Sequence, residues 1–463
     1  MNYMFSAIAI PLLGAFLIIL LPGRIKAYAS VSALGLSCFF SVLAAVSVLK
    51  LKVFVSERYI TDWLSISFAA DGTAVFMAIV SSFVAFLISL YSLEYMKDYE
   101  NRGEFYFWMV LFVGSMMGLI FSANLMLLYC FWEITAVCSW RLIGFYRKEK
   151  DLKAADRAFM ITFFGASLLL VGIVLTYLNY SSTDMFFLRD KALVNTVAFL
   201  FLAGIISKSA QLPLQTWLPD AGVAPTPVTA LLHAAVLVKI GVYVFARLFN
   251  LTFIASPLFM NTAIFISVST IIVAGACALI ENNLKKILAY STISQLGYIL
   301  LALSLNSALS LKIALLYILA HSLAKAGLFL CAGIVEHESG TKDINELGGL
   351  AKTMPLTATA FLLSAFSIVG IPPFLGFWPK FMVVVTALTT GHAIAGVFAI
   401  IGALFTLLYL FRLFDKVFLG GQKISAREGK NSLMVLVVMI LGVLSVLLGL
   451  LFKLPLNFLN AGL

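Results

Sequence analysis

Long apolar stretches follow one another along almost the whole chain, separated by short polar connections. A helix needs about 20 apolar residues to cross the hydrocarbon core of a bilayer. Fourteen stretches approach or exceed this length, at residues 2–22, 28–49, 72–96, 105–123, 124–146, 158–178, 192–211, 225–249, 259–280, 286–306, 310–335, 355–387, 391–411 and 432–456. The longest connections, around residues 50–71 and 336–354, are too short to hold a soluble domain. The pattern predicts one all-α polytopic membrane domain over residues 1–463.

Two of these spans contain helix-breaking prolines together with an intramembrane lysine. The first reads GIISKSAQLPLQTWLP at 204–219, and the second reads SIVGIPPFLGFWPK at 367–380. The residues that mark the two breaks are Lys208, Pro213, Pro372, Pro373, Pro379 and Lys380. A proline inside a helix breaks or kinks it, and a broken helix survives in a bilayer only where protein or water surrounds it. A matched pair of such helices predicts inverted repeats around a mid-membrane pathway, here residues 105–249 and 259–411; chance placement of prolines is the alternative.

The composition supports a membrane protein and excludes most other classes. Of the residues, 62% are hydrophobic and 11% are charged, whereas a soluble domain is about half apolar and roughly a quarter charged. This excludes secreted, fibrous, disordered and nucleic-acid-binding proteins. The net charge of +10 is what Lys and Arg flanking the cytoplasmic ends of membrane spans produce.

The distribution of basic residues predicts the orientation of the chain. Of the 31 Lys and Arg, 18 lie in odd-numbered connections, 8 in even-numbered connections or at the C-terminus, and 5 within spans. Because basic residues concentrate on the cytoplasmic side, the odd-numbered connections are predicted to be cytoplasmic and both termini extracytoplasmic. The apolar N-terminus has no preceding basic residue and no small-residue cleavage site, so it is expected to be a first span and not a signal peptide.

Ionisable side chains deep in the spans are the candidates for function. They are Glu133, Lys208, Lys239, Lys325 and Lys380, with His233 and His321 beside them. Each charge at the centre of a bilayer costs roughly 2.5–3.5 kcal/mol, so structural polarity alone rarely explains a set of this size. Glu133 is the only acidic residue deep in a span, and we expect Lys208 to be its partner. A purely structural ion pair is the alternative, and it would leave three lysines unexplained.

The remaining lysines lie near histidines. His321 and Lys325 are spaced i, i+4 and share a helix face. His233 and Lys239 are separated by about 600° of helix rotation, so they do not share a face but could flank a water chain at different depths. A histidine that only packs in the core is the alternative in both cases. The spacing predicts no metal site, because no carboxylate or thiol accompanies these residues.

Buried lysines suit proton transfer for a physical reason. The pKa of lysine is near 10.4 in water and burial can lower it by several units, whereas arginine does not deprotonate in proteins. A row of lysines linked by histidines and water can therefore conduct protons, and a nearby carboxylate can control their release.

The residues around these lysines resemble the signature of antiporter-like membrane subunits. These occur in complex I, in Mrp-type sodium/proton antiporters, and in membrane-bound hydrogenases and formate hydrogenlyases. The most similar run is SKSAQLPLQTWLPDAGVAPTPVTALLHAAVLVKIGVYVFAR at 207–247. Similar segments also lie at 70–96, 131–145, 283–299, 321–335 and 370–381.

The resemblance implies a fold of about fourteen transmembrane helices with two inverted five-helix repeats, each containing a broken helix. It implies that Glu133 is the family's glutamate and Lys208 its broken-helix lysine. Lys239 and Lys325 match the central lysines, and Lys380 matches an exit position that is Lys in some members and Glu in others. The chain stops soon after its last span, so we do not expect the long lateral helix of the distal complex I subunit.

The expected function is that of a proton-translocating membrane subunit in a redox-driven respiratory complex of a prokaryotic cell membrane. No flavin, haem, nucleotide or iron–sulfur motif is present, so no cofactor is expected and a peripheral redox module would supply the electron transfer. The expected partners are other membrane subunits, that module and the lipid bilayer. An Mrp-type antiporter subunit that exchanges sodium for protons is the first alternative, and a non-conducting scaffold is the second.

Overall fold

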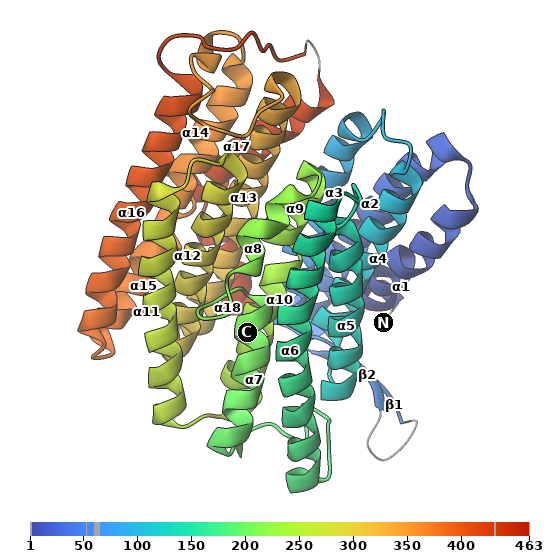
Figure 1. The fold of residues 1–463 in the computed structure, drawn as a ribbon. Coiled ribbons are helices and arrows are strands. Elements are labelled where there is room, and N and C mark those ends of the chain that lie inside the picture. The colour runs from blue at the N-terminus through green and yellow to red at the C-terminus, as the bar shows by residue number, and fades with distance from the viewer. Residues whose placement is uncertain (1, 52, 60–64, 430–431, 463) are drawn as a thin grey trace.

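The helices of the protein run side by side between two opposite edges of the molecule (Figure 1). This computed structural model describes residues 2–51, 53–59, 65–429 and 432–462. Lys52 and Lys430, which belong to the basic residues counted above, lie outside these ranges. The all-α polytopic membrane fold predicted from the sequence is confirmed.

Within the described residues, twelve helical spans are long and apolar enough to cross a membrane. Eleven are single helices: α1 (Asn2–Leu20), α2 (Gly23–Leu51), α3 (Gly72–Tyr95), α4 (Arg102–Phe121), α5 (Leu125–Ile143), α6 (Glu149–Tyr180), α11 (Pro257–Ile280), α12 (Leu284–Ser304), α13 (Ser310–Ser339), α16 (Ala393–Phe418) and α17 (Leu433–Leu450). The twelfth is composite and contains α9 (Thr226–Ala230), the π-helical turn η2 (Leu231–Ala235), α10 (Leu237–Phe245) and the π-helical turn η3 (Ala246–Asn250).

The other two predicted spans, 192–211 and 355–387, are broken helices. The first begins with α7 (Asn195–Lys208) and extends beyond the predicted span. It continues through an irregular segment around Pro213, α8 (Trp217–Asp220) and the 3-10 turn η1 (Ala221–Val223). The second contains α14 (Pro355–Val369), a break at Pro372 and Pro373, and α15 (Phe377–Thr389). Pro379 does not mark the break as predicted, because it is the third residue of α15, where its missing N–H removes no intrahelical hydrogen bond.

The same local structures recur in two stretches of the chain, 159 residues apart. The N-terminal caps of α5 and α12 are Asn124 and Asn283, and each pairs with a later aspartate, Asp184 or Asp343. The helices α6 and α13 end at residues 180 and 339, and each is followed by a residue in the left-handed region. Four crossings of the bundle lie between α4 and α11: α5, α6, the broken helix that begins with α7, and the span that contains α9 and α10. Because this number is even, corresponding helices run in opposite directions.

The polar connections hold little regular structure. The strands β1 (Phe54–Tyr59) and β2 (Ser65–Ala70) form an antiparallel hairpin in a region predicted to be a loop, at the opposite edge from the connection after α16 (Figure 1). Two further strands, β3 (Lys191–Ala192) and β4 (Phe253–Ile254), make a short parallel pair. A 3-10 turn, η4 (Leu350–Lys352), precedes α14, and α18 (Lys453–Gly462) follows α17.

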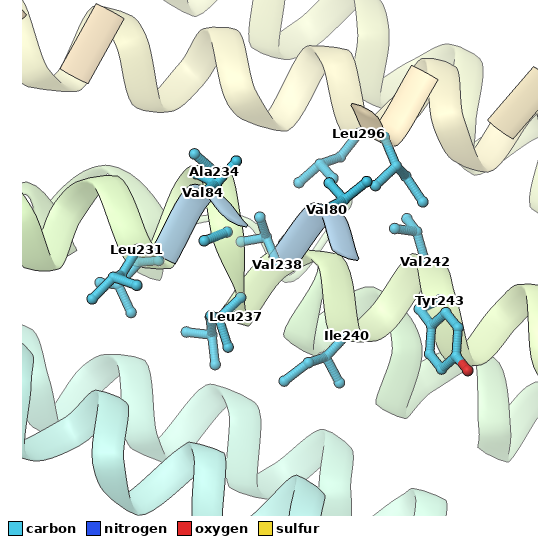
Figure 2. Packing of buried hydrophobic residues seen from close by; sticks show 14 of the residues in the cluster. Val80, Val84, Leu231, Ala234, Leu237, Val238, Ile240, Val242, Tyr243 and Leu296 are labelled. Atoms are coloured by element: carbon cyan, nitrogen blue, oxygen red, sulfur yellow. The ribbon is translucent and has the colours of Figure 1, made fainter. Parts of the chain in front are cut away.

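The composite span from Thr226 to Asn250 is the centre of the bundle, and the whole of its apolar window is buried. Its leucine, valine and isoleucine side chains pack against Val80 and Val84 of α3 and Leu296 of α12 (Figure 2). In contrast, less than half of the apolar window is buried in α1, α6 and α16. Charged groups on the central span are therefore remote from both lipid and water.

Candidate functional site

Glu133 and Lys208 lie on neighbouring helices, but they do not form the direct ion pair expected from the sequence. The Lys208 ammonium, at the last residue of α7, is fully buried and donates to the Trp132 carbonyl at 3.2 Å. It also lies 5.3 Å from the centre of the Trp132 ring. Glu133 is only partly buried, on a side of α5 where Ile134 and Val137 are exposed. No ion pair joins the two side chains, and Oε1 of Glu133 has no hydrogen-bond partner among the described residues.

Lys239 and His321 are brought into direct contact at the centre of the molecule. The Lys239 ammonium lies against Nδ1 of His321, which is on α13, and donates to the His233 carbonyl at 3.2 Å. All three residues are fully buried. The sequence placed Lys239 and His321 among the candidates but gave no indication that these two would touch.

An irregularity in the central span makes this contact possible. The residue Val236 has φ −127° and ψ −80°, far from helical values, between η2 and α10. Because the regular helix stops there, the His233 carbonyl is free to accept from Lys239. The apolar pattern predicted one continuous helix over residues 225–249, since neither proline nor glycine stands at the interruption.

The His233 ring makes no hydrogen bond to Lys239, whose ammonium donates to the His233 carbonyl. The ring packs on Phe329 of α13 with 4.4 Å between ring centres. Both of its nitrogens, and Nε2 of His321, are buried without a hydrogen-bond partner among the described residues. Buried polar atoms of this kind are normally satisfied by protein or by ordered water, so these imidazoles mark the most polar part of the core.

Lys325 and Lys380 are held in the second half of the molecule. Lys325, one turn after His321 on α13, donates to the Leu288 carbonyl of α12 at 3.1 Å. Lys380 on α15 donates to the Ile368 and Val369 carbonyls at the end of α14, at 2.7 and 3.1 Å. A cation at the C-terminal end of a helix is favoured by the helix dipole.

All four intramembrane lysines therefore share one kind of environment. Each ammonium group donates to at least one main-chain carbonyl, and among the described residues none lies within 4.0 Å of a carboxylate. Both an ammonium and a neutral amine can donate a hydrogen bond to a carbonyl. A carboxylate partner would instead favour the charged form.

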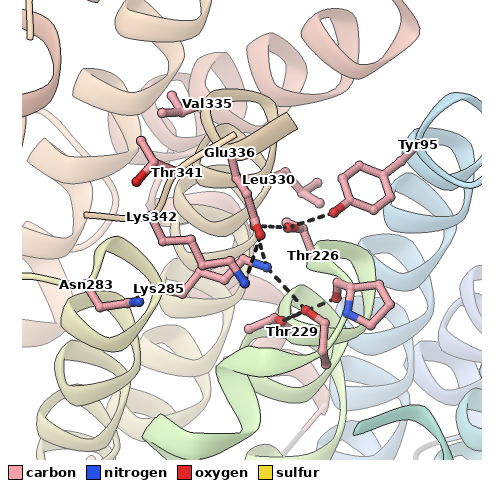
Figure 3. A network of polar contacts seen from close by, with 12 residues as sticks. Tyr95, Thr226, Thr229, Asn283, Lys285, Leu330, Val335, Glu336, Thr341 and Lys342 are labelled. Atoms are coloured by element: carbon pink, nitrogen blue, oxygen red, sulfur yellow. Dashed lines mark hydrogen bonds and ion pairs between the residues drawn. The ribbon is translucent and has the colours of Figure 1, made fainter. Parts of the chain in front are cut away.

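A second charged cluster was not identified from the sequence (Figure 3). The carboxylate of Glu336, on α13, binds Lys285 at 2.7 Å and Lys342 at 2.8 Å. The Lys285 side chain is 2% exposed and also donates to the Ala224 carbonyl at 3.2 Å. The sequence analysis placed Lys285 and Glu336 in polar connections, because their positions at the ends of spans resemble those of ordinary boundary residues.

A buried ion pair at the opposite edge was also missed. Arg247, in η3, pairs with Asp71, which caps the N-terminus of α3 through the Ala74 amide. This pair links the end of the central span to α3. No group of three His, Cys, Asp or Glu side chains that could hold a metal ion is present in the described part of the chain.

Two family descriptions match the chain. Residues 122–406, more than half of the chain, match the family described as "NADH:quinone oxidoreductase/Mrp antiporter, TM". Residues 61–106 match the family described as "NADH-Ubiquinone oxidoreductase (complex I), chain 5 N-terminus".

Curated relatives come from two kinds of complex. The chain is 33% identical to the L subunit of the NADH-quinone oxidoreductase of Escherichia coli over 483 residues, covering 99% of this chain and 78% of the relative. It is 35% identical to NAD(P)H-quinone oxidoreductase chain 5 of Synechocystis over 400 residues, and 37% identical to a Na(+)/H(+) antiporter subunit of Bacillus subtilis over 370 residues. These matches cover 80% and 73% of this chain, but only 57% and 46% of the two relatives, so the chain spans about half of their length.

Two solved structures share the fold over the whole chain. The Mrp complex from Dietzia sp. contains a chain that superposes with a TM-score of 0.90 at 22% identity, covering 100% of this chain and 97% of that one. A chain of the membrane-bound sulfane sulfur reductase, an archaeal respiratory membrane complex, superposes with a TM-score of 0.89 at 23% identity and the same coverage.

Proposed function

Since the chain belongs to the family of membrane subunits shared by NADH:quinone oxidoreductases and Mrp antiporters, we propose that it moves protons across the membrane within a redox-driven complex. The observation that carries the proposal is the buried contact between Lys239 and His321, at the centre of a row of lysines held by main-chain carbonyls. Its relatives in E. coli and Synechocystis are subunits of quinone oxidoreductases.

The proposed pathway follows the buried ionisable residues from one broken helix to the other. It begins at Glu133 and Lys208, passes Lys239 and His321, and continues through Lys325 to Lys380. Direct contact joins Lys239 to His321, and one helical turn joins His321 to Lys325. Water molecules complete the remaining links, and the unpartnered nitrogens of His233 and His321 are suited to bind them.

The carbonyl environment supports reversible protonation. A lysine locked to a carboxylate is stabilised as a cation, whereas a lysine bonded only to carbonyls keeps a hydrogen bond in either state. The charge of Glu133, which interacts with Lys208 without contacting it, then acts on the lysine from a distance. Movement of that carboxylate would change the affinity of Lys208 for its proton.

The repeats and the orientation form part of the same proposal. The recurrence of caps and bridges 159 residues apart supports two inverted repeats at 105–249 and 259–411. In this arrangement each repeat supplies one broken helix to the pathway. The basic connections, including the one that contains Lys416 and Lys423, would face the cytoplasm, and both termini would lie outside. The redox centres would be held by partner subunits.

Sodium/proton exchange is the second candidate function, favoured by the 37% identity to the antiporter protein of Bacillus subtilis. Sodium needs oxygen ligands at mid-membrane, and Glu133 is the carboxylate that lies beside the proposed pathway. Main-chain carbonyls and hydroxyls near the two breaks are the other available ligands.

The proposal is tested by measuring proton transport in vesicles that contain the assembled complex. We expect Lys208→Ala and Glu133→Ala to assemble normally and to lower redox-coupled proton transport by about tenfold or more, because each removes a proton-carrying or controlling charge. Lys416→Gln, which changes an exposed lysine in the last turn of α16, is the control and should transport normally. Full coupled transport by both pathway variants would contradict the proposal, and dependence of transport on sodium would favour the second candidate.

A further inference from the structure

A basic pocket of about 290 Å³ lies outside the proposed pathway, between the start of α6, the α8–η1 segment and the start of α12. Its charged lining residues are Lys150, Lys153, Arg157, Lys286, Lys342 and Asp220. Asp220, the carboxylate among these lining residues, pairs with two of the cations: with Arg157 at 2.8 Å and with Lys286 at 3.5 Å. Lys153 pairs with Glu149 at 2.6 Å and Lys342 pairs with Glu336 at 2.8 Å, whereas Lys150 has no ion pair within the described residues. The lining therefore carries a surplus of positive charge that an anion would balance.

The basic end of α6 continues into an apolar face that points outward. Lys153, Arg157, Met160 and Phe164 are spaced so that they share one side of the helix. Met160 is 64% exposed and Phe164 is 57% exposed. The end of α11, which leads into the pocket residue Asn283, exposes Ile280 in the same way. Two cations followed by two large apolar side chains along one face match an amphiphile with an anionic head and hydrocarbon tails.

An aromatic residue places this pocket at the level of the membrane interface. The Trp140 indole, on α5, donates to Asp156 at 2.8 Å and packs beside Phe159 of α6. Tryptophan is enriched where hydrocarbon meets headgroups. The pocket thus lies at the depth that phospholipid phosphates occupy, with the apolar face of α6 extending toward the hydrocarbon.

We propose that this pocket binds the phosphate group of an anionic phospholipid, with the acyl chains of that lipid along Met160 and Phe164. Arg157 offers a planar guanidinium that suits phosphate oxygens, and Lys150 and Lys153 add flexible ammonium donors. Basic pockets between transmembrane helices are suited to anionic headgroups. A phospholipid accounts for both the cationic pocket and the exposed apolar stripe, whereas a free phosphate accounts only for the first.

Native mass spectrometry of the protein in detergent, titrated with phosphatidylglycerol and with phosphatidylcholine, tests this assignment. The test variant is Lys150→Gln combined with Lys153→Gln, since both side chains are exposed and neither belongs to the proposed pathway. The matched control is Lys97→Gln combined with Lys416→Gln, which removes two exposed lysines on the same edge of the bundle but outside the pocket. Circular dichroism and gel filtration check that both variants are folded.

We expect the unmodified chain and the control to bind phosphatidylglycerol more tightly than phosphatidylcholine. The pocket variant should lose roughly 25-fold in affinity for phosphatidylglycerol, about fivefold for each lysine near a membrane surface. Inorganic phosphate at millimolar concentration should not displace the lipid.

Equal phosphatidylglycerol binding by the pocket variant and the control would overturn the assignment, as would equal binding of the two lipids. Displacement by inorganic phosphate would show that a soluble anion is the ligand. The proposal would also be overturned if the pocket bound no lipid in the assembled complex. This result would be expected if an acidic segment of a neighbouring protein filled the pocket.

Discussion

The hydrogen-bond partners of the buried lysines determine how readily these side chains can release a proton. Transfer of an ammonium group from water into a bilayer is expensive, and the usual compensation is a carboxylate partner. Here main-chain carbonyls provide the hydrogen bonds instead, at the end of α14 for Lys380 and beside the irregular turn for Lys239. The lysines of the Glu336 cluster are different, because Lys285 pairs with a carboxylate, which favours its charged form.

The contact between Lys239 and His321 gives a prediction for a single residue. His321→Ala removes the imidazole that contacts the Lys239 ammonium, so we expect proton transport to fall by at least about tenfold. Loss of this buried hydrogen bond should lower the free energy of unfolding by about 1–3 kcal/mol. Transport in vesicles and thermal unfolding in detergent measure the two effects. His337→Ala, at the exposed end of the same helix, should leave both unchanged; equal transport by the two variants would contradict the role of His321.

Glu336 offers a comparison between two lysines on one carboxylate. Lys285→Met should lower the free energy of unfolding by about 3 kcal/mol, because it removes the buried cation that pairs with Oε2 of Glu336. Lys342→Met should cost no more than about 1 kcal/mol, since the Lys342 side chain is 33% exposed. Unfolding of the two variants in detergent provides the measurement, and equal destabilisation would show that burial does not control the strength of this cluster.

At the scale of elements, the two broken helices owe their shape to close packing as well as to proline. The second break turns tightly enough that a Cβ atom on Gly376 would lie 1.8 Å from the Ser367 carbonyl oxygen. Gly370, at the end of α14, adopts a φ of +87° that favours glycine. The break therefore depends on small residues at positions where the main chain approaches itself, next to the carbonyls that bind Lys380.

This packing predicts the effect of a single methyl group. Gly376→Ala should destabilise the protein by about 1–3 kcal/mol, because the backbone must shift to relieve the overlap, and should lower proton transport by displacing α15. Gly421→Ala is the control, since a Cβ atom there meets nothing within 4 Å. Thermal unfolding and vesicle transport are compared for both variants. A stable and fully active Gly376→Ala variant would show that the geometry of this break is not required.

At the scale of the whole molecule, the outer helices shield a polar interior from lipid. The central span is surrounded by α3, α12 and α13, while α6, α11 and α16 expose apolar side chains such as Phe265 and Phe411. Hydrocarbon cannot satisfy main-chain polar groups, so the irregular turns are tolerated only in this protected position. The arrangement keeps the residues of the proposed pathway away from the lipid.

The predicted orientation of the molecule can be tested by chemical labelling. Lys191→Cys lies in an even-numbered connection and Lys416→Cys lies in an odd-numbered one. We expect a membrane-impermeant maleimide to label the first in intact cells and the second only after permeabilisation, because basic connections face the cytoplasm. The unmodified chain, with its five native cysteines, gives the background. Labelling of Lys416→Cys in intact cells, and of Lys191→Cys only after permeabilisation, would show the opposite orientation.

The sequence by itself determined the spans, the two breaks and four of the buried lysines, Lys208, Lys239, Lys325 and Lys380. These follow from local properties of the chain: the length of apolar runs, the inability of proline to continue a helix, and the cost of a charge among apolar neighbours. The family resemblance rested on the same residues and was confirmed by the comparisons. Pro379 shows the limit of such reasoning, because a proline acts differently in the first turn of a helix and in its middle.

Only the tertiary structure decided which of these groups touch. The interruption at Val236, the contact of Lys239 with His321 and the burial of Lys285 beside Glu336 depend on how helices far apart in the sequence pack together. No local pattern encodes which main-chain carbonyl is left free for a lysine, since that depends on the position of every neighbouring helix. Hydrophobicity selects the segments that enter the membrane, and packing between them determines their polar contacts.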